Sequence, residues 1–128
     1  MPFKFEKLIV WQIALDLADA VYQLTVKYFS KEEIYVLTSQ IRRAADSVSL
    51  NIAEGSTGQS NAAFTRFLNI AVRSDVEVVG CLYLGRKRNY IKNNDFEVIY
   101  KQCEEILVMI NGLKNALAKE SEDSRQKI

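Results

Sequence analysis

Residues 96–117, FEVIYKQCEEILVMINGLKNAL, carry the cleanest hydrophobic repeat in the chain. The apolar positions alternate at spacings of three and four residues over three heptads, and they are Phe96, Ile99, Cys103, Ile106, Ile110, Leu113 and Leu117. A 3.5-residue period keeps one face of an α-helix turned toward a neighbouring helix along its whole length. The stretch therefore predicts a long helix, over about residues 95–118, that packs lengthwise against other helices.

Three earlier segments have the periodicity of helices with one apolar face, and short polar stretches separate them. We predict helices over residues 6–29, 31–54 and 61–88. Together with the last helix, they predict an all-α fold, a single up-down-up-down antiparallel four-helix bundle over residues 1–118. Residues 119–128 are polar and have no repeat, so we predict a disordered tail there.

Local signals place the inner face of the first helix and the ends of the second. On the first helix the predicted buried stripe is Leu8, Trp11, Leu15, Ala18, Tyr22, Thr25 and Phe29, and Ala14, Val21 and Tyr28 are expected to widen it. Ser30 and Glu33 have the spacing of a capping box at the start of the second helix. Gly55 stands where a residue in the left-handed conformation would end that helix.

Composition excludes several classes of protein. The 128 residues suffice for one domain, and 48% hydrophobic with 26% charged residues is the balance of a globular protein. One proline and five glycines are too few for the frequent turns of a β-sandwich or barrel. The sequence has no histidine, which removes Ser-His and Cys-His nucleophile systems, His-ligated zinc and the Glu-x-x-His di-iron bundle. We therefore predict no enzymatic activity, no catalytic residue, no metal and no cofactor.

Charge and cysteine content bear on partners and location. Seventeen Lys and Arg against sixteen Asp and Glu give a formal net charge of +1, so any nucleic-acid surface would be a local patch. Cys81 and Cys103 fall in apolar helical patterns and are too few for a disulfide scaffold. The sequence shows no secretory signal and no apolar run of about 18 residues, the length of a membrane span. These features predict a cytoplasmic protein with reduced thiols and no membrane contact.

The second predicted helix carries a polar stripe beside its apolar one. The members of this polar stripe are Gln40, Arg43, Ser47, Asn51 and Glu54. A solvent face is usually rich in Lys and Glu, whereas these short or planar side chains can form hydrogen bonds when half-buried. We favour a contact with another helix, within or between subunits. A ligand or phosphate site on Arg42 and Arg43, or plain exposure to solvent, are the alternatives.

Seven cations are candidates for contacts with nucleic acid: Arg42, Arg66, Arg73, Arg86, Lys87, Arg88 and Lys92. Residues 86–88 and Lys92 form a basic run, and Tyr90 beside them could stack on a base. Residues 86–88 also lie near the end of a predicted helix, where cations complement the helix dipole. Arg66 and Arg73, one heptad apart, could extend a basic surface. Both interpretations of the run are open.

Several blocks of the chain resemble one known family. Residues 5–12 (FEKLIVWQ), 37–45 (LTSQIRRAA) and 47–55 (SVSLNIAEG) resemble the 23S ribosomal RNA intervening-sequence proteins, a four-helix-bundle family also called S23. The likeness extends to about residue 117. It departs from the family at Ala63, where an acidic capping residue is expected, and at Arg73, where glycine is common.

The resemblance implies small antiparallel bundles that assemble into rings, commonly homopentamers. A similar branch, the accessory proteins of diversity-generating retroelements, binds a reverse transcriptase and nucleic acid through a basic surface. We therefore expect a non-enzymatic homo-oligomeric scaffold with RNA or DNA as a partner. The alternative is an adaptor that binds another protein and no nucleic acid.

Overall fold

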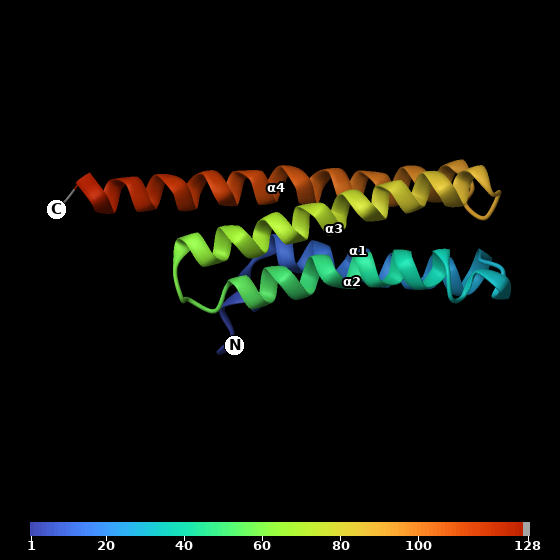
Figure 1. Ribbon diagram of the computed structural model, residues 1–128, viewed down its shortest axis with the longest axis horizontal. Helices are drawn as coiled ribbons and strands as arrows, with labels where there is room; N and C mark the ends of the chain where they lie inside the picture. Colours follow the sequence, from blue (N-terminus) through green and yellow to red (C-terminus); the bar gives the residue numbers. More distant parts are fainter. Residues whose placement is uncertain (127–128) are drawn as a thin grey trace.

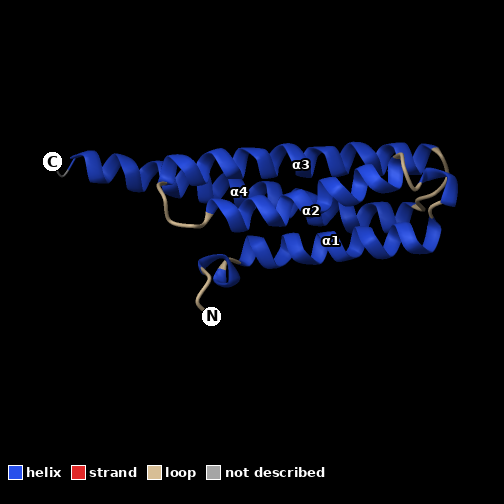
Figure 2. Cartoon of the chain, turned by 60° about the horizontal axis from the view of Figure 1, so that its bottom comes forward, coloured by secondary structure: helices blue, strands red, loops and turns tan. Residues whose placement is uncertain are grey.

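The computed structural model describes residues 1–126, which form four long helices packed side by side (Figure 1). The helices are α1 (Ile9–Tyr28), α2 (Leu37–Gly55), α3 (Asn61–Lys87) and α4 (Asn93–Gln126), with short 3-10 helices η1 (Lys4–Lys7) and η2 (Lys31–Glu33) before α1 and α2. Helices adjacent in sequence contact each other, and α1 also contacts α4, so the four helices close into a bundle. Short loops join them, and the described residues contain no strand (Figure 2). The predicted all-α four-helix bundle is confirmed.

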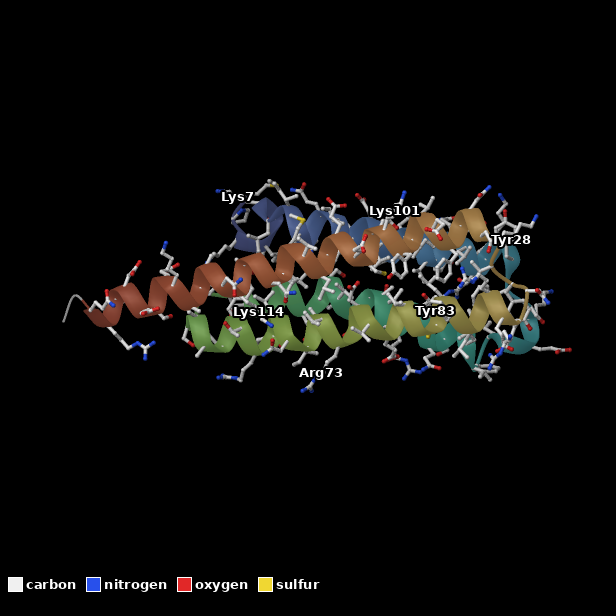
Figure 3. All side chains as sticks on the ribbon, turned by 90° about the horizontal axis from the view of Figure 1, so that it is seen from above. Lys7, Tyr28, Arg73, Tyr83, Lys101 and Lys114 are labelled. Carbon is white, nitrogen blue, oxygen red and sulfur yellow. The ribbon has the colours of Figure 1, made fainter. Side chains whose placement is uncertain are left out.

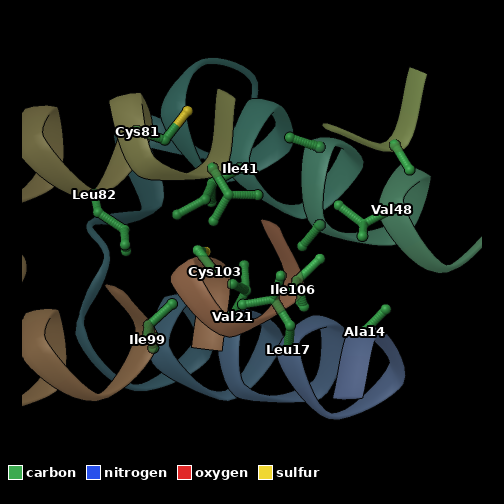
Figure 4. Close-up of a cluster of buried hydrophobic side chains, with 14 of the residues drawn as sticks. Ala14, Leu17, Val21, Ile41, Val48, Cys81, Leu82, Ile99, Cys103 and Ile106 are labelled. Atoms are coloured by element: carbon green, nitrogen blue, oxygen red, sulfur yellow. The ribbon is translucent and has the colours of Figure 1, made fainter. Parts of the chain in front are cut away.

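The core lies between the four helices, and each helix contributes apolar residues to it (Figure 4). On α4 the buried residues are Phe96, Ile99, Cys103, Ile106, Ile110 and Leu117, and Leu113 is partly buried. All positions of the predicted repeat therefore face the bundle. Complete burial of one such aliphatic side chain contributes roughly 1.5–3 kcal/mol, so this seam is a major source of stability.

The predicted inner face of α1 is wrong in its rotation about the helix axis. The buried residues are Val10, Ala14, Leu17, Val21, Leu24 and Thr25. Thr25 belongs to the predicted stripe, and Ala14 and Val21 belong to the positions expected to widen it. Leu15 and Tyr22 are 48% and 51% exposed. The reason is that α1 carries two apolar stripes, roughly 120° apart at 3.6 residues per turn. Periodicity detects both stripes and does not say which one faces the core.

The second helix begins six residues later than predicted, at Leu37. The Ser30 hydroxyl accepts a hydrogen bond from the Glu32 amide (3.2 Å) and caps η2, not α2. Glu33 accepts a hydrogen bond from the Leu37 amide at 3.3 Å, within the first turn of α2. The two residues of the expected capping box thus serve two different helices, and the turn between them exposes Tyr35.

The expected role of Gly55 is also wrong, since this residue belongs to the last turn of α2 and has no positive φ. A Cβ atom at this position would lie 2.6 Å from the Phe67 Cβ on α3. Gly55 therefore allows a close approach of α2 and α3. The left-handed residue is Gly58, in the loop between α2 and α3, with φ of 87°.

The predicted disordered tail is wrong over residues 119–126, where α4 continues to Gln126. Residues 127–128 lie outside the described residues. No glycine or proline follows Gly112 to end the helix. The Asn61 side-chain amide of α3 donates hydrogen bonds to the Leu117 carbonyl (3.4 Å) and the Ser121 hydroxyl (3.2 Å), and so holds α4 near the predicted boundary. Beyond it, α4 projects past the other helices (Figures 1 and 2).

We expect Gly55→Ala to lower the free energy of unfolding, because α2 and α3 would have to separate to admit the new methyl group. Overpacking of this kind costs about 1–3 kcal/mol. Gly112→Ala is the matched control, since its Cβ would meet no atom within 4 Å and alanine is favoured over glycine in a helix by about 1 kcal/mol. Urea unfolding followed by circular dichroism would measure both. Equal stabilities for the two variants would contradict the close contact.

Candidate functional site

The structure divides the polar stripe of α2 into an inner and an outer part. Ser47 and Asn51 form the inner part and are half-buried. The Asn51 amide donates hydrogen bonds to the Ser47 carbonyl (2.8 Å) and hydroxyl (2.9 Å), and the Ser74 hydroxyl of α3 donates to the Ser47 hydroxyl (2.8 Å). These hydrogen bonds connect the polar stripe directly to α3.

The outer part of the stripe, Gln40, Arg43 and Glu54, is exposed. Arg43 donates a hydrogen bond to Ser39 on its own helix at 3.3 Å. Among the described residues, neither Arg43 nor Glu54 forms an ion pair. The outer side chains are therefore available to a partner, whereas the inner ones already have theirs.

A shallow pocket of about 420 Å³ lies along this part of the α2–α3 contact. Its lining residues are Gln40, Arg43, Ala44 and Ser47 of α2 with Ser74 and Glu77 of α3, and we call it the α2–α3 groove. Glu77 was not singled out in the sequence. The spacing could have pointed to Glu77, because residues three apart lie on the same face of a helix and Ser74 and Glu77 both flank the apolar stripe of α3.

The candidate cation Arg42 lies on the opposite side of α2 and contacts α1. Its Nε donates a hydrogen bond to the Thr25 hydroxyl at 2.7 Å, and its guanidinium stacks over the Tyr22 ring, 4.5 Å from the centroid. Burial raises the pKa of nearby Asp46, and the positive charge of Arg42 partly offsets this. Arg42 therefore joins α2 to α1 and is already engaged within the chain.

Two members of the basic run 86–88 are likewise engaged within the chain. The guanidinium of Arg86 lies 3.8 Å from the centroid of the Phe96 ring. Arg88 forms an ion pair with Glu33 (3.5 Å), and the Tyr90 hydroxyl donates to the same Glu33 oxygen at 3.4 Å. Tyr90 is half-buried and packs against the core, with its ring centroid 5.3 Å from that of Phe29.

The remaining candidate cations are exposed. They are Arg66, Arg73 and Lys87 on α3, with Lys92 after it. Figure 3 shows Arg73 pointing away from the bundle, on the side opposite Lys101 of α4. Of the seven cations, Arg42, Arg86 and Arg88 are held by contacts inside the chain, and the other four are exposed.

Asp75 is a buried acid that is not among the site residues predicted from the sequence. It is 2% exposed on α3, and one of its carboxylate oxygens has no hydrogen-bond partner among the described residues. Burial raises its pKa to about 7, partly offset by a hydrogen bond with the Cys103 thiol of α4. The spacing carried a signal, since Asp75 falls within the buried series Leu68, Ala71, Asp75, Val78 and Leu82.

Both cysteines are buried and unpaired. The Cys81 sulfur points away from the helix that carries Cys103 (Figure 4). Burial raises the pKa of the Cys81 thiol to about 11, and burial together with Asp75 raises that of Cys103. Both thiols are therefore protonated and weakly nucleophilic at neutral pH.

The described residues contain no group of three or more His, Cys, Asp or Glu side chains that could hold a metal ion. None of the helices that the structure describes is both long enough and apolar enough to span a membrane. The arrangement offers hydrogen-bonding and charged groups for recognition. Ser47 and Ser74, the hydroxyls of the α2–α3 groove, bond to each other, and the carboxylate of Glu77 lines the same groove.

Comparison with known families identifies the chain. The model of the 23S rRNA-intervening sequence protein family matches residues 6–112. The chain belongs to this family. The match includes the α2–α3 groove, Asp75 and all seven candidate cations, and it ends before the last turns of α4.

A solved structure supports the assignment. This member of the 23S rRNA-intervening sequence family is similar to a crystal structure of a protein of unknown function from the S23 ribosomal protein family of Bacteroides thetaiotaomicron VPI-5482. The two are 28% identical with a TM-score of 0.74, and the match covers 83% of this chain and 98% of the other. A comparison with curated proteins gave no match.

We expect stability to fall as pH rises through the pKa of Asp75. Its pKa is about 7 in the folded protein and near 3.8 when unfolded, so folding favours the protonated acid. The associated stability is present below pH 4 and is lost progressively up to about pH 7, by at most about 4 kcal/mol. Urea unfolding of the native chain and of Asp75→Asn between pH 4 and pH 8 measures this loss.

In that experiment Asp75→Asn should flatten the pH dependence. Glu105→Gln, which alters an exposed acid of α4, is the control and should leave it unchanged. Parallel curves for the native chain and Asp75→Asn would show that Asp75 ionises normally in the folded protein.

Proposed function

We propose that this protein is a non-enzymatic scaffold that self-associates through the outer face of α1 and α2. The observation that carries the proposal is the second apolar stripe of α1. Leu15, Tyr22 and Val26 on this stripe are 48%, 51% and 58% exposed, and Ala18 between them is partly buried. Apolar side chains that gather on one exposed helix face often mark a protein interaction site.

The neighbouring face of α2 extends this apolar surface and gives it a polar component. Leu50 is 65% exposed and lies eight residues, or about 12 Å, from Arg42 along α2. Arg42 and Asp46 supply charged groups next to the α1 stripe. Apolar area surrounded by a few fixed polar groups is the usual anatomy of a protein interface.

The homopentameric ring that the family resemblance implies is the assembly we expect. In such a ring each copy presents the same surfaces again, so weak contacts to a partner would add up. The buried, reduced thiols fit action in the cytoplasm.

Nucleic acid is the partner that we propose for the scaffold. Arg66, Arg73 and Lys87 are exposed along α3, seven and then fourteen residues apart, or about 10 Å and 21 Å along the axis. A row of cations of this kind contacts phosphates without reading sequence. The alternative is an adaptor whose ring binds another protein.

We expect Leu15→Glu combined with Val26→Glu to reduce the mass of the assembly to that of a 14.6 kDa monomer. Both side chains are exposed within one chain, so the helical fold should survive the exchange. Light scattering after size exclusion measures the mass, and circular dichroism verifies the fold. Val108→Glu, at an exposed position of α4, is the control and should stay assembled. A native protein that is monomeric at micromolar concentration would refute self-association.

We expect Arg66→Ala, Arg73→Ala and Lys87→Ala together to weaken RNA binding and to reduce the salt dependence of the affinity by about three counterions. Fluorescence anisotropy with a labelled RNA at several salt concentrations measures both. Lys101→Ala, on the side of the bundle opposite Arg73, is the control (Figure 3). A native protein without RNA affinity at low salt that captures one protein partner in stoichiometric amount would favour the adaptor instead.

A further inference from the structure

A separate pocket of about 220 Å³ lies between α3 and α4, on the flank of α3 away from the α2–α3 groove. Asp75 and Cys103, both buried, line its inner end. Leu107 and Tyr100 contribute apolar and aromatic walls. Val76 and Glu104 are exposed and therefore lie at the solvent side, so a ligand would enter by displacing surface side chains.

The Asp75 carboxyl is incompletely bonded where it stands. The Cys103 thiol beside it lowers the pKa of the carboxyl, but a thiol is only a weak donor. The Oδ1 oxygen of Asp75 is shielded from water and has no partner among the described residues, which is unfavourable for a buried polar atom. No Lys or Arg lines the pocket, so the chain itself supplies no counter-ion there.

We propose that this pocket binds an ammonium or guanidinium group carried on a short apolar stem, with Asp75 as its counter-ion. Such a group donates several hydrogen bonds. It also carries the positive charge that an ionised carboxylate needs as its counter-ion. Its stem matches the Leu107 and Tyr100 walls, and a cation near an aromatic ring gains further attraction. Glu104 places a second negative charge at the entrance.

The pocket is smaller than the 300–1,000 Å³ or so of most drug-sized sites, so it suits one group the size of a Lys or Arg side chain. A free alkylamine or alkylguanidine, or a basic side chain of a second copy, has this chemistry. The first source is independent of the proposed self-association, and the second depends on it.

Titrating the native protein with butylguanidinium, followed by two-dimensional NMR of the backbone amides, tests the site directly. The shifts should map to residues around Asp75 and Cys103, and butanol should fail to reproduce them. Asp75→Asn should abolish binding, whereas Glu105→Gln on the exposed face of α4 should keep it. Melting curves establish that both variants fold.

The pH dependence distinguishes a counter-ion from a mere apolar cavity. Affinity should rise about tenfold from pH 6 to pH 8, because ionisation of Asp75 near pH 7 creates the charge that binds the cation. The other titratable groups lining the pocket are Tyr100, Cys103 and Glu104, all on α4. In Asp75→Asn the rise should disappear.

The mass of the assembly separates the two sources. Butylguanidinium binding with an unchanged mass in Asp75→Asn assigns the pocket to a free ligand. A native assembly that resists butylguanidinium and loses mass in Asp75→Asn assigns it to a basic side chain of a second copy. Binding that survives Asp75→Asn, or no binding together with an unchanged mass, overturns the proposal. A monomeric native protein refutes self-association alone, and the titration still decides the pocket.

Discussion

The close contact of α2 with α3 is the constraint on which the rest of the structure depends. It is the most extensive helix pairing in the bundle, and Gly55 leaves no room for even a methyl group against Phe67. At this separation the short side chains of Ser47 and Ser74 reach each other at 2.8 Å. Longer side chains at these positions would push the helices apart. The α2–α3 groove is therefore a consequence of close packing, with its longer members Arg43 and Glu77 at the edges.

The sequence predicts the fold well where one helix carries one apolar stripe. On α4 all seven repeat positions face the bundle, because their alternation of three and four residues continues over three heptads while charged residues such as Glu104 and Lys101 lie on other faces. On α1 the same reasoning selects the wrong face, because Leu15 and Leu17 are equally apolar and lie on different stripes. The choice between them depends on the neighbouring helices, whose positions the periodicity of one helix does not contain.

The candidate site is less predictable than the fold, for a related reason. Helical spacing places Ser47 and Asn51 on one stripe, but it does not reveal that Ser74 approaches them from α3. The basic run shows the same limit. Charge alone groups Arg86 and Arg88 with Lys87, and it does not reveal that Phe96 of α4 and Glu33 of η2 engage the first two. Which cations remain available to an outside partner therefore depends on the aromatic and acidic side chains that folding places beside them.

Ser74 and Asp75 together explain how an acid stays buried in this bundle. They are adjacent on α3, so their side chains point about 100° apart, one toward α2 and the other toward α4. A rotation of α3 that brought the Asp75 carboxyl to water would carry Ser74 away from Ser47 and break that hydrogen bond. It would also move Leu68 and Leu82, which are fully buried on the same helix, out of the core. The apolar stripe and the serine pair thus fix the rotation of α3 from both sides. The carboxyl therefore stays buried, and this burial raises its pKa to about 7.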